Sequence, residues 1–123
     1  IIFFLDQAKE LARKDKVEFH DNYEKNLETI RILRRKYGIT HDDVIDEVKD
    51  LILNLKIEDY YQGPDNDDNP SRNYIFWKFG KKLFGSEELY IKLQIEEIKE
   101  EKLVCWSFHY PERPIKYPKK VEG

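Results

Sequence analysis

Cysteine is almost absent from this chain, whose 123 residues contain only Cys105. A single cysteine excludes an internal disulfide and a cysteine-based zinc site within one chain, and a reducing, cytoplasmic setting is the natural expectation. Long hydrophobic runs are absent too, because no apolar stretch approaches the ~20 residues that span a bilayer. The opening IIFFL is short and has no basic segment before it, so we expect neither a signal peptide nor a membrane partner.

Glycine and proline are also scarce, with five of each. Hydrophobic residues make up 40% of the chain and charged residues 38%, which is typical of a folded domain with a heavily solvated surface. The length predicts one domain over residues 1–123. Charge is uneven: residues 1–70 carry 11 basic and 17 acidic residues, whereas residues 71–123 carry 11 and 8. A polyanion is therefore expected to bind the C-terminal half.

The first part of the chain, residues 1–56, has helical periodicity. Helices are predicted over 1–14, over about 22–37 and from Thr40 onward, with a short extended piece at 17–19. Gly38 is a suitable C-terminal cap, and Thr40 followed by Asp42 and Asp43 is a suitable helix start. The inward stripe of the second helix is predicted to contain Tyr23, Leu27, Ile30, Leu33 and Tyr37.

Residues 57–73 are predicted as a loop, because GPDNDDNPSRN (63–73) is dense in turn formers and acids. The acids lack the central glycine and the distal glutamate of an EF-hand, so no metal site is expected there. After this loop, apolar residues recur at every second position, as in a strand. Strands are predicted over 74–82, 89–97 and 103–110, within a strand region of 74–110, and a Pro- and Lys-rich tail follows over 111–123.

Helices followed by strands with short connections predict an α+β fold, in which N-terminal helices pack on one face of a C-terminal antiparallel sheet. Alternation assigns side chains to the two faces. The face toward the helices is predicted to contain Ile75, Trp77, Phe79, Leu89, Ile91, Leu93, Ile95, Val104, Trp106 and Phe108. Opposite lies a face that we call the open face, predicted to contain Phe76, Lys78, Tyr90, Lys92, Gln94, Ser107 and His109, together with Tyr74 and Cys105.

The open face combines residue types that suit RNA chemistry. Aromatic rings stack on bases, lysines neutralise phosphate, and histidine gives or takes a proton near neutral pH. Such a set cleaves RNA without a metal, through attack of the 2′-hydroxyl on the neighbouring phosphate. The alternative to a functional site is that the uncovered face of an antiparallel sheet is polar simply because it is exposed to solvent.

Three stretches in fixed order, EDYYQGPDNDD, IFWKFGKKLFGSEELYIKL and LVCWSFHYPERPIKYP, resemble the MqsR-like toxins of bacterial toxin–antitoxin pairs. The resemblance covers about residues 57–118. It implies a RelE-like, microbial-RNase-type fold, an mRNA endonuclease activity, no cofactor, and a cognate antitoxin that can be a zinc-bearing, DNA-binding protein.

The resemblance also implies roles for individual residues. The family's catalytic tyrosine falls on Tyr90 and the lysine after it on Lys92. The basic residue that closes the last strand falls on His109, where the best-known member has lysine. The family's first-strand glutamine falls near Trp77 or Lys78, and a lysine of the family is replaced by Gln62.

We therefore expect His109 to act as general acid or base, Lys78 and Lys92 to stabilise phosphate, and Tyr90 to stack or orient. Substrate binding is expected to involve Tyr60, Tyr61, Gln62, Phe76, Gln94, Ser107, Lys116 and Tyr117. The tail prolines are expected to hold Arg113, with Lys116 and Tyr117, near the rim of the site. Two rivals remain: a non-catalytic RNA- or protein-binding module that uses the open face, and an interaction domain whose acidic helices bind a partner.

Overall fold

The computed structural model of the protein describes residues 1–121. Its first half contains α1 (Ile2–Arg13), β1 (Val17–Phe19), α2 (Glu24–Tyr37) and α3 (His41–Leu53). A 3-10 turn η1 (Ile57–Asp59) leads into β2 (Tyr60–Asn66), β3 (Ile75–Leu83), β4 (Glu87–Glu96) and β5 (Lys102–His109). The three predicted helices and the short extended piece at 17–19 are all confirmed.

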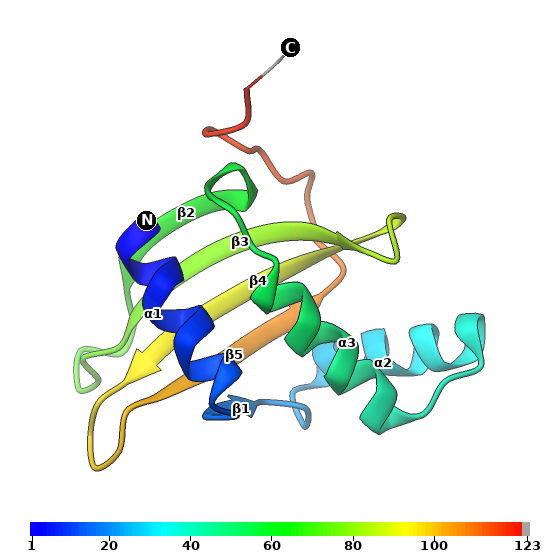
Figure 1. Ribbon diagram of the computed structural model, residues 1–123, viewed down its shortest axis with the longest axis horizontal. Helices are drawn as coiled ribbons and strands as arrows, with labels where there is room; N and C mark the ends of the chain where they lie inside the picture. The colour runs from blue at the N-terminus through cyan, green and yellow to red at the C-terminus, as the bar shows by residue number, and fades with distance from the viewer. Residues whose placement is uncertain (122–123) are drawn as a thin grey trace.

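The strands form one five-stranded sheet in the order β1-β5-β4-β3-β2. Every neighbouring pair is antiparallel except β1 and β5. The helices pack against the sheet, and Figure 1 shows α1 and α3 in front of it, with the chain after β5 crossing behind β4 and β3. The predicted α+β class, with N-terminal helices packed against a sheet, is confirmed.

The turns between the helices have the caps that the sequence predicts. Gly38 ends α2 with a φ of 64°, a conformation that glycine adopts with little strain. Thr40 precedes α3, where its hydroxyl accepts a hydrogen bond from the Asp43 N–H at 3.1 Å. The Asp43 carboxylate in turn accepts from the Thr40 N–H at 3.0 Å, which completes a reciprocal capping box.

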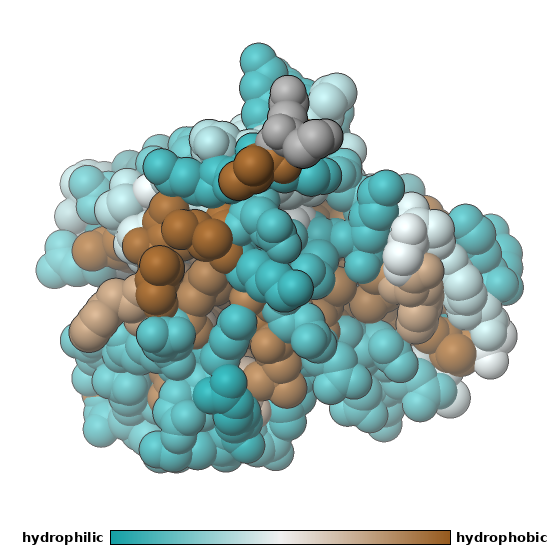
Figure 2. Space-filling model, turned by 45° about the horizontal axis from the view of Figure 1, so that its top comes forward, coloured by the Kyte–Doolittle hydropathy of each residue, from teal (hydrophilic) through white to brown (hydrophobic). Residues whose placement is uncertain are grey.

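The hydrophobic core lies between the helices and the sheet. Phe79, Ile91 and Phe108 on the sheet and Leu33 and Val48 on the helices are fully buried or nearly so. Burying such side chains drives folding by about 1.5–3 kcal/mol each. At the start of α1, by contrast, Ile2 and Phe3 are exposed, and Figure 2 shows hydrophobic side chains gathered at that end of the molecule on an otherwise largely hydrophilic face.

The predicted loop over 57–73 is partly wrong, because Tyr60–Asn66 forms the edge strand β2 beside β3. Its pairing with β3 contains two register shifts, one on each side of Gln62. Gly63 has a φ of 124°, and an added Cβ would lie 2.7 Å from the Phe76 carbonyl oxygen. An edge strand tolerates proline and irregular pairing because only one side of it is hydrogen-bonded. The turn-forming composition therefore concealed a strand.

The predicted faces of the last strand are also partly wrong. Lys92 pairs with Ser107, but Leu93 pairs with Cys105, so Trp106 is an extra residue in a β-bulge. The bulge reverses the alternation before it: Cys105 joins the core, and Trp106 packs among the rings of the open face. Val104 moves to the open face as the partner of Gln94. Ile75, also predicted in the core, is half exposed.

Candidate active site on the open face of the sheet

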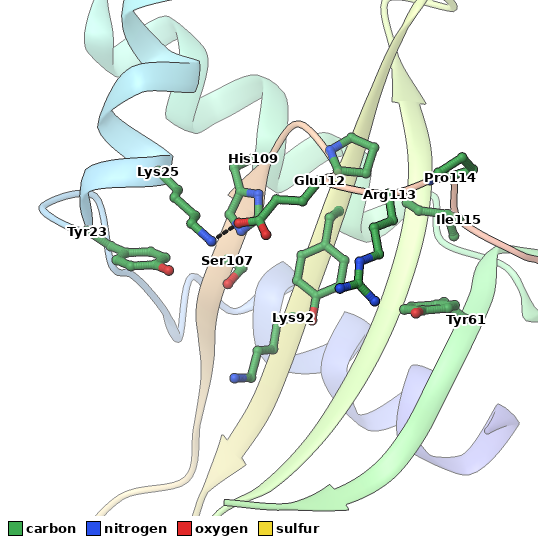
Figure 3. A pocket seen from close by; sticks show the side chains of 12 residues that line it. Tyr23, Lys25, Tyr61, Lys92, Ser107, His109, Glu112, Arg113, Pro114 and Ile115 are labelled. Atoms are coloured by element: carbon green, nitrogen blue, oxygen red, sulfur yellow. Dashed lines mark ion pairs between the residues drawn. The ribbon is translucent and has the colours of Figure 1, made fainter. Parts of the chain in front are cut away.

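A pocket of about 320 Å³ lies on the open face. We call it the catalytic pocket, after the role that we propose for it below. Figure 3 shows its side chains converging from β2, β4 and β5, from the start of α2, and from the tail after β5. It is lined by Tyr23, Lys25, Tyr61, Tyr90, Lys92, Ser107, His109, Pro111, Glu112, Arg113, Pro114 and Ile115.

Strand register brings four of the predicted site residues together. Tyr90 is the pairing partner of His109, and Lys92 is the partner of Ser107. Residues two apart on one strand point to the same face, so these four side chains form a compact square. All four line the catalytic pocket, as alternation on the two strands predicts.

Side chains from α2 hold β5 in place around His109. The strand β1 pairs only as far as Cys105, so the following backbone N–H groups of β5 need other partners. The N–H of Phe108 donates to the Asn26 side chain at 3.0 Å, and the N–H of Tyr110 donates to the Thr29 hydroxyl at 3.3 Å.

Asn26 also fixes the bulge itself. Its amide donates to the carbonyl of Trp106 at 3.0 Å and to the carbonyl of His20 at 2.8 Å, and the side chain is fully buried. A buried amide with all of these partners is rigid. The helical stripe predicted for α2 misses this role, because it places Tyr23 inward, where the structure has Tyr23 exposed and Asn26 buried.

His109 is 8% exposed, and its Nδ1 lies 2.9 Å from the carbonyl oxygen of Tyr110. A carbonyl only accepts, so this contact places the proton on Nδ1 and leaves the lone pair on Nε2. Nε2 has no hydrogen-bond partner among the described residues. Every fully buried side-chain nitrogen or oxygen of those residues has a partner, so Nε2 is not fully buried. Nε2 therefore reaches the pocket. Burial lowers the pKa of His109 below its usual 6.5, which favours the neutral base at pH 7.

The ring of Tyr90 stacks on His109, with centroids 5.2 Å apart and planes inclined by 29°. The ring of Tyr61 lies edge to face with that of Tyr90, with centroids 6.3 Å apart. Burial raises the pKa of Tyr90 to about 12, with smaller contributions from Tyr61 and Asp65. The phenol therefore stays protonated at neutral pH, where it can donate a hydrogen bond and hold the imidazole ring in position.

Lys92 supplies a positive charge that no carboxylate of the described residues neutralises through an ion pair. Its Nζ lies 4.0 Å from the ring centroid of Phe76, a cation–π contact. Burial lowers the pKa of Lys92, and the neighbouring charge of Lys78 lowers it further. An ammonium that is partly desolvated and unpaired attracts a phosphate strongly.

Lys78 is the pairing partner of Lys92 across β3 and β4, but it does not line the catalytic pocket. Its ammonium forms an ion pair with Asp65 at 3.0 Å and faces a neighbouring cavity. Phe76 lines that cavity as well. The structure thus places two predicted site residues beside the pocket rather than in it.

The remaining predicted residues divide into near and distant sets. Tyr61 and Ser107 line the pocket, but Tyr60 turns to the other side of the sheet and packs on the core. The Gln62 amide donates to Asp65 at 2.7 Å, and Gln94 accepts from the Trp106 indole at 2.9 Å. Neither glutamine lines the catalytic pocket.

The tail forms one wall of the pocket. Ile115 packs directly on Gly80, where an added Cβ would lie 2.7 Å from it. Beyond this point Tyr117 donates a hydrogen bond to Glu88 at 2.8 Å, and Lys116 is exposed. Neither Lys116 nor Tyr117 lines the catalytic pocket, although the preceding residue Ile115 does.

Arg113 does line the pocket as predicted, and Figure 3 shows its guanidinium extending back over the sheet on the side of Tyr61. The sequence did not indicate that Tyr23, Lys25 or Glu112 would belong to the site, but all three also line the pocket. Lys25 forms an ion pair with Glu112, which joins the start of α2 to the tail beside His109 (Figure 3). No local pattern could indicate this contact, because 87 positions of the sequence separate its two residues.

Residues 1–121 contain no group of three or more His, Cys, Asp or Glu side chains placed to hold a metal ion. In the same part of the chain, none of the helices has the length and apolar character needed to cross a bilayer. No protein-family model, no curated protein and no solved structure matches this chain. The chemistry assigned to the site therefore rests on its own residues.

Proposed function

We propose that this protein is an endoribonuclease that cleaves messenger RNA without a metal ion, as the toxin of a toxin–antitoxin pair. The observation that carries the catalytic part is the geometry of His109. Its Nδ1 proton is held by a backbone carbonyl, its Nε2 reaches the pocket, and the unpaired ammonium of Lys92 lines the same pocket. A neutral imidazole beside a cation is what in-line attack by a 2′-hydroxyl requires.

In the proposed reaction, Nε2 of His109 takes the proton of the 2′-hydroxyl as its oxygen attacks the adjacent phosphorus. Lys92 and Arg113 stabilise the charge that builds up on the phosphoryl oxygens. The bond from phosphorus to the 5′-oxygen then breaks. That oxygen takes a proton from the Lys92 ammonium, whose lowered pKa makes it a better acid than an exposed lysine. The products are a 2′,3′-cyclic phosphate and a 5′-hydroxyl, and solvent restores both protonation states.

The rings of the pocket support a single-stranded substrate. Tyr61, Tyr90 and Tyr23 line it, and unpaired bases stack on aromatic side chains at a gain of about 1–3 kcal/mol per base. A non-catalytic RNA-binding module would use the same rings and cations. Chemistry distinguishes the two, because a binding module would not release new RNA ends.

The toxin role and the antitoxin partner rest on the resemblance of residues 57–118 to MqsR-like toxins. An mRNA substrate would place the activity in the cytoplasm. Any zinc would belong to the antitoxin partner. If the role is right, expression of the wild-type protein arrests growth, expression of His109→Ala does not, and co-expression of the protein encoded beside it restores growth.

The decisive experiment incubates wild-type protein and His109→Ala with a defined RNA and analyses the ends. We expect cyclic phosphate and 5′-hydroxyl ends from the wild type, and a rate about 10²- to 10⁴-fold lower from the variant. The control is His41→Ala, which removes a histidine that pairs with Asp21 at 3.0 Å and does not line the pocket. Equal cleavage by His109→Ala, or activity abolished by a chelator, would overturn the mechanism.

A further inference from the structure

A second cavity of about 450 Å³ adjoins the catalytic pocket on the open face. Lys92 lines both, so the two hollows meet at the proposed phosphate-binding cation. We call the second one the acceptor cavity. It is lined by Asp65, Asn66, Asp67, Asp68, Asn69, Arg72, Phe76, Lys78, Lys92 and Trp106.

The floor of the acceptor cavity is aromatic. Phe76 and Trp106 line it and lie edge to face, with ring centroids 5.8 Å apart. Tyr74, whose ring centroid lies 5.6 Å from that of Trp106, packs beside them but lines another cavity. Trp106 is half-buried, so part of the indole faces the cavity. The bulge in β5 is what brings Trp106 to this face. Flat aromatic surface next to a phosphate site suits a nucleobase.

The wall of the acceptor cavity is a run of carboxylates and amides at the end of β2 and the start of the connection to β3. Most of its acceptors are already used: Asp65 pairs with Lys78 at 3.0 Å, and Asp67 pairs with Arg72 at 3.1 Å. Asp68 is exposed and has neither a hydrogen bond nor an ion pair with any described residue. Its carboxylate is therefore a free acceptor at the rim of an aromatic cavity.

We propose that the acceptor cavity is a nucleobase subsite that selects bases carrying an exocyclic amino group. The proposal rests on the endoribonuclease function above and names the substrate feature which that site prefers. The base next to the scissile phosphate lies against Trp106, and its amino group donates to the carboxylate of Asp68. The paired cations Lys78 and Arg72 offset the two other carboxylates, so the acidic wall does not repel the RNA backbone.

The chemistry of the four bases explains the selection. Adenine, cytosine and guanine each carry an amino group that donates hydrogen bonds, whereas uracil presents a carbonyl oxygen where cytosine has its amino group. A carboxylate attracts the amino group of cytosine and repels the carbonyl oxygen that uracil has in the same place. A hydrogen bond to a charged acceptor that forms with one ligand and is lost with the other corresponds to a preference of about tenfold or more.

The test measures binding of 2′-O-methyl oligouridylates, which cannot be cleaved because the nucleophilic hydroxyl is blocked. One series carries a single cytosine. The matched series carries 2-pyrimidinone, which is cytosine without its amino group. We expect the wild-type protein to bind the cytosine oligonucleotide about tenfold more tightly than the 2-pyrimidinone oligonucleotide or the all-uridine control.

Variants assign the preference to Asp68. Asp68→Ala should bind the two oligonucleotides equally, and Asp68→Asn, which keeps a neutral acceptor, should show an intermediate preference. Asp46→Ala is the matched control, because it removes the same charge from an exposed position on α3 that lines neither cavity. It should keep the full preference.

Equal binding of the two oligonucleotides by wild-type protein, or an undiminished preference in Asp68→Ala, overturns the subsite whether or not RNA is cleaved. Cleavage of RNA without any such preference leaves the endoribonuclease standing and removes the subsite. A preference that depends on Asp68, with no cleavage of any RNA, supports the subsite and removes the catalytic proposal.

Discussion

The two faces of the sheet differ in what each strand residue contacts. On the face toward the helices, Phe79, Ile91 and Phe108 have no exposed surface. On the open face, Tyr90 and Lys92 alternate with Ile91 but remain half-buried around two cavities. The helices bury one set and hold the backbone. The other set lines the two cavities, although His109 and Ser107 are only 8% and 6% exposed. Stability and the proposed chemistry therefore depend on different residues of the same strands, and paired substitutions on neighbouring residues can separate them.

The largest expected effect is on folding. Phe108→Ala removes a fully buried ring that packs edge to face on Phe19, and it should lower the free energy of unfolding by about 3–5 kcal/mol. Its neighbour Ser107→Ala, on the open face, should change it by less than about 1 kcal/mol. Urea denaturation followed by circular dichroism measures both. Similar losses for the two variants would mean that the faces do not divide as described.

A smaller effect is expected on RNA affinity, where Lys92 and Lys78 can be compared across one strand pair. Lys92→Gln should weaken binding about tenfold and reduce the slope of log affinity against log salt by about 0.7, the value for one phosphate contact on single-stranded RNA. Lys78→Gln should do less, because Asp65 already pairs with Lys78. Titrations at several salt concentrations decide this, and equal effects would show that both lysines meet phosphate.

The smallest expected effect is on the pH profile. The proposed base must be neutral, and burial lowers the pKa of His109 below 6.5, so kcat/KM should fall only when the pH drops below that value. The charge of Lys25 contributes to the lowering. Lys25→Ala should therefore raise this pKa and move the acidic limb to slightly higher pH. The profile of the variant measures the shift, and a move to lower pH would contradict the assigned cause.

Much of this architecture could be predicted from local patterns. Gly38 and Thr40 mark a helix end and a helix start because caps depend on a few neighbouring residues. The alternation along β4 places Tyr90 and Lys92 on the open face, since a regular strand has a period of two. The square of Tyr90, Lys92, Ser107 and His109 follows from that alternation and from antiparallel pairing.

Other features had no local signal. The bulge at Trp106 reverses the faces of one strand, and it is held by Asn26, which lies 80 positions earlier in the sequence. The strand β2 was hidden by turn-forming residues, and the Lys25–Glu112 contact joins distant segments. Each of these depends on which backbone groups remain unpaired after the sheet assembles, and no short window of sequence contains that information.

The sequence by itself determined the α+β class, the three helices, and the residues of β4 and the end of β5 that meet on the open face. These are properties of periodicity and capping, which act over a few residues. Only the tertiary structure decided that Tyr23, Lys25 and Glu112 line the pocket, that Lys78 lies outside it, and that Trp106 faces the acceptor cavity. The physical reason is that buried polar groups must find partners across the whole fold, and the bulge and the tail wall are where those partners lie.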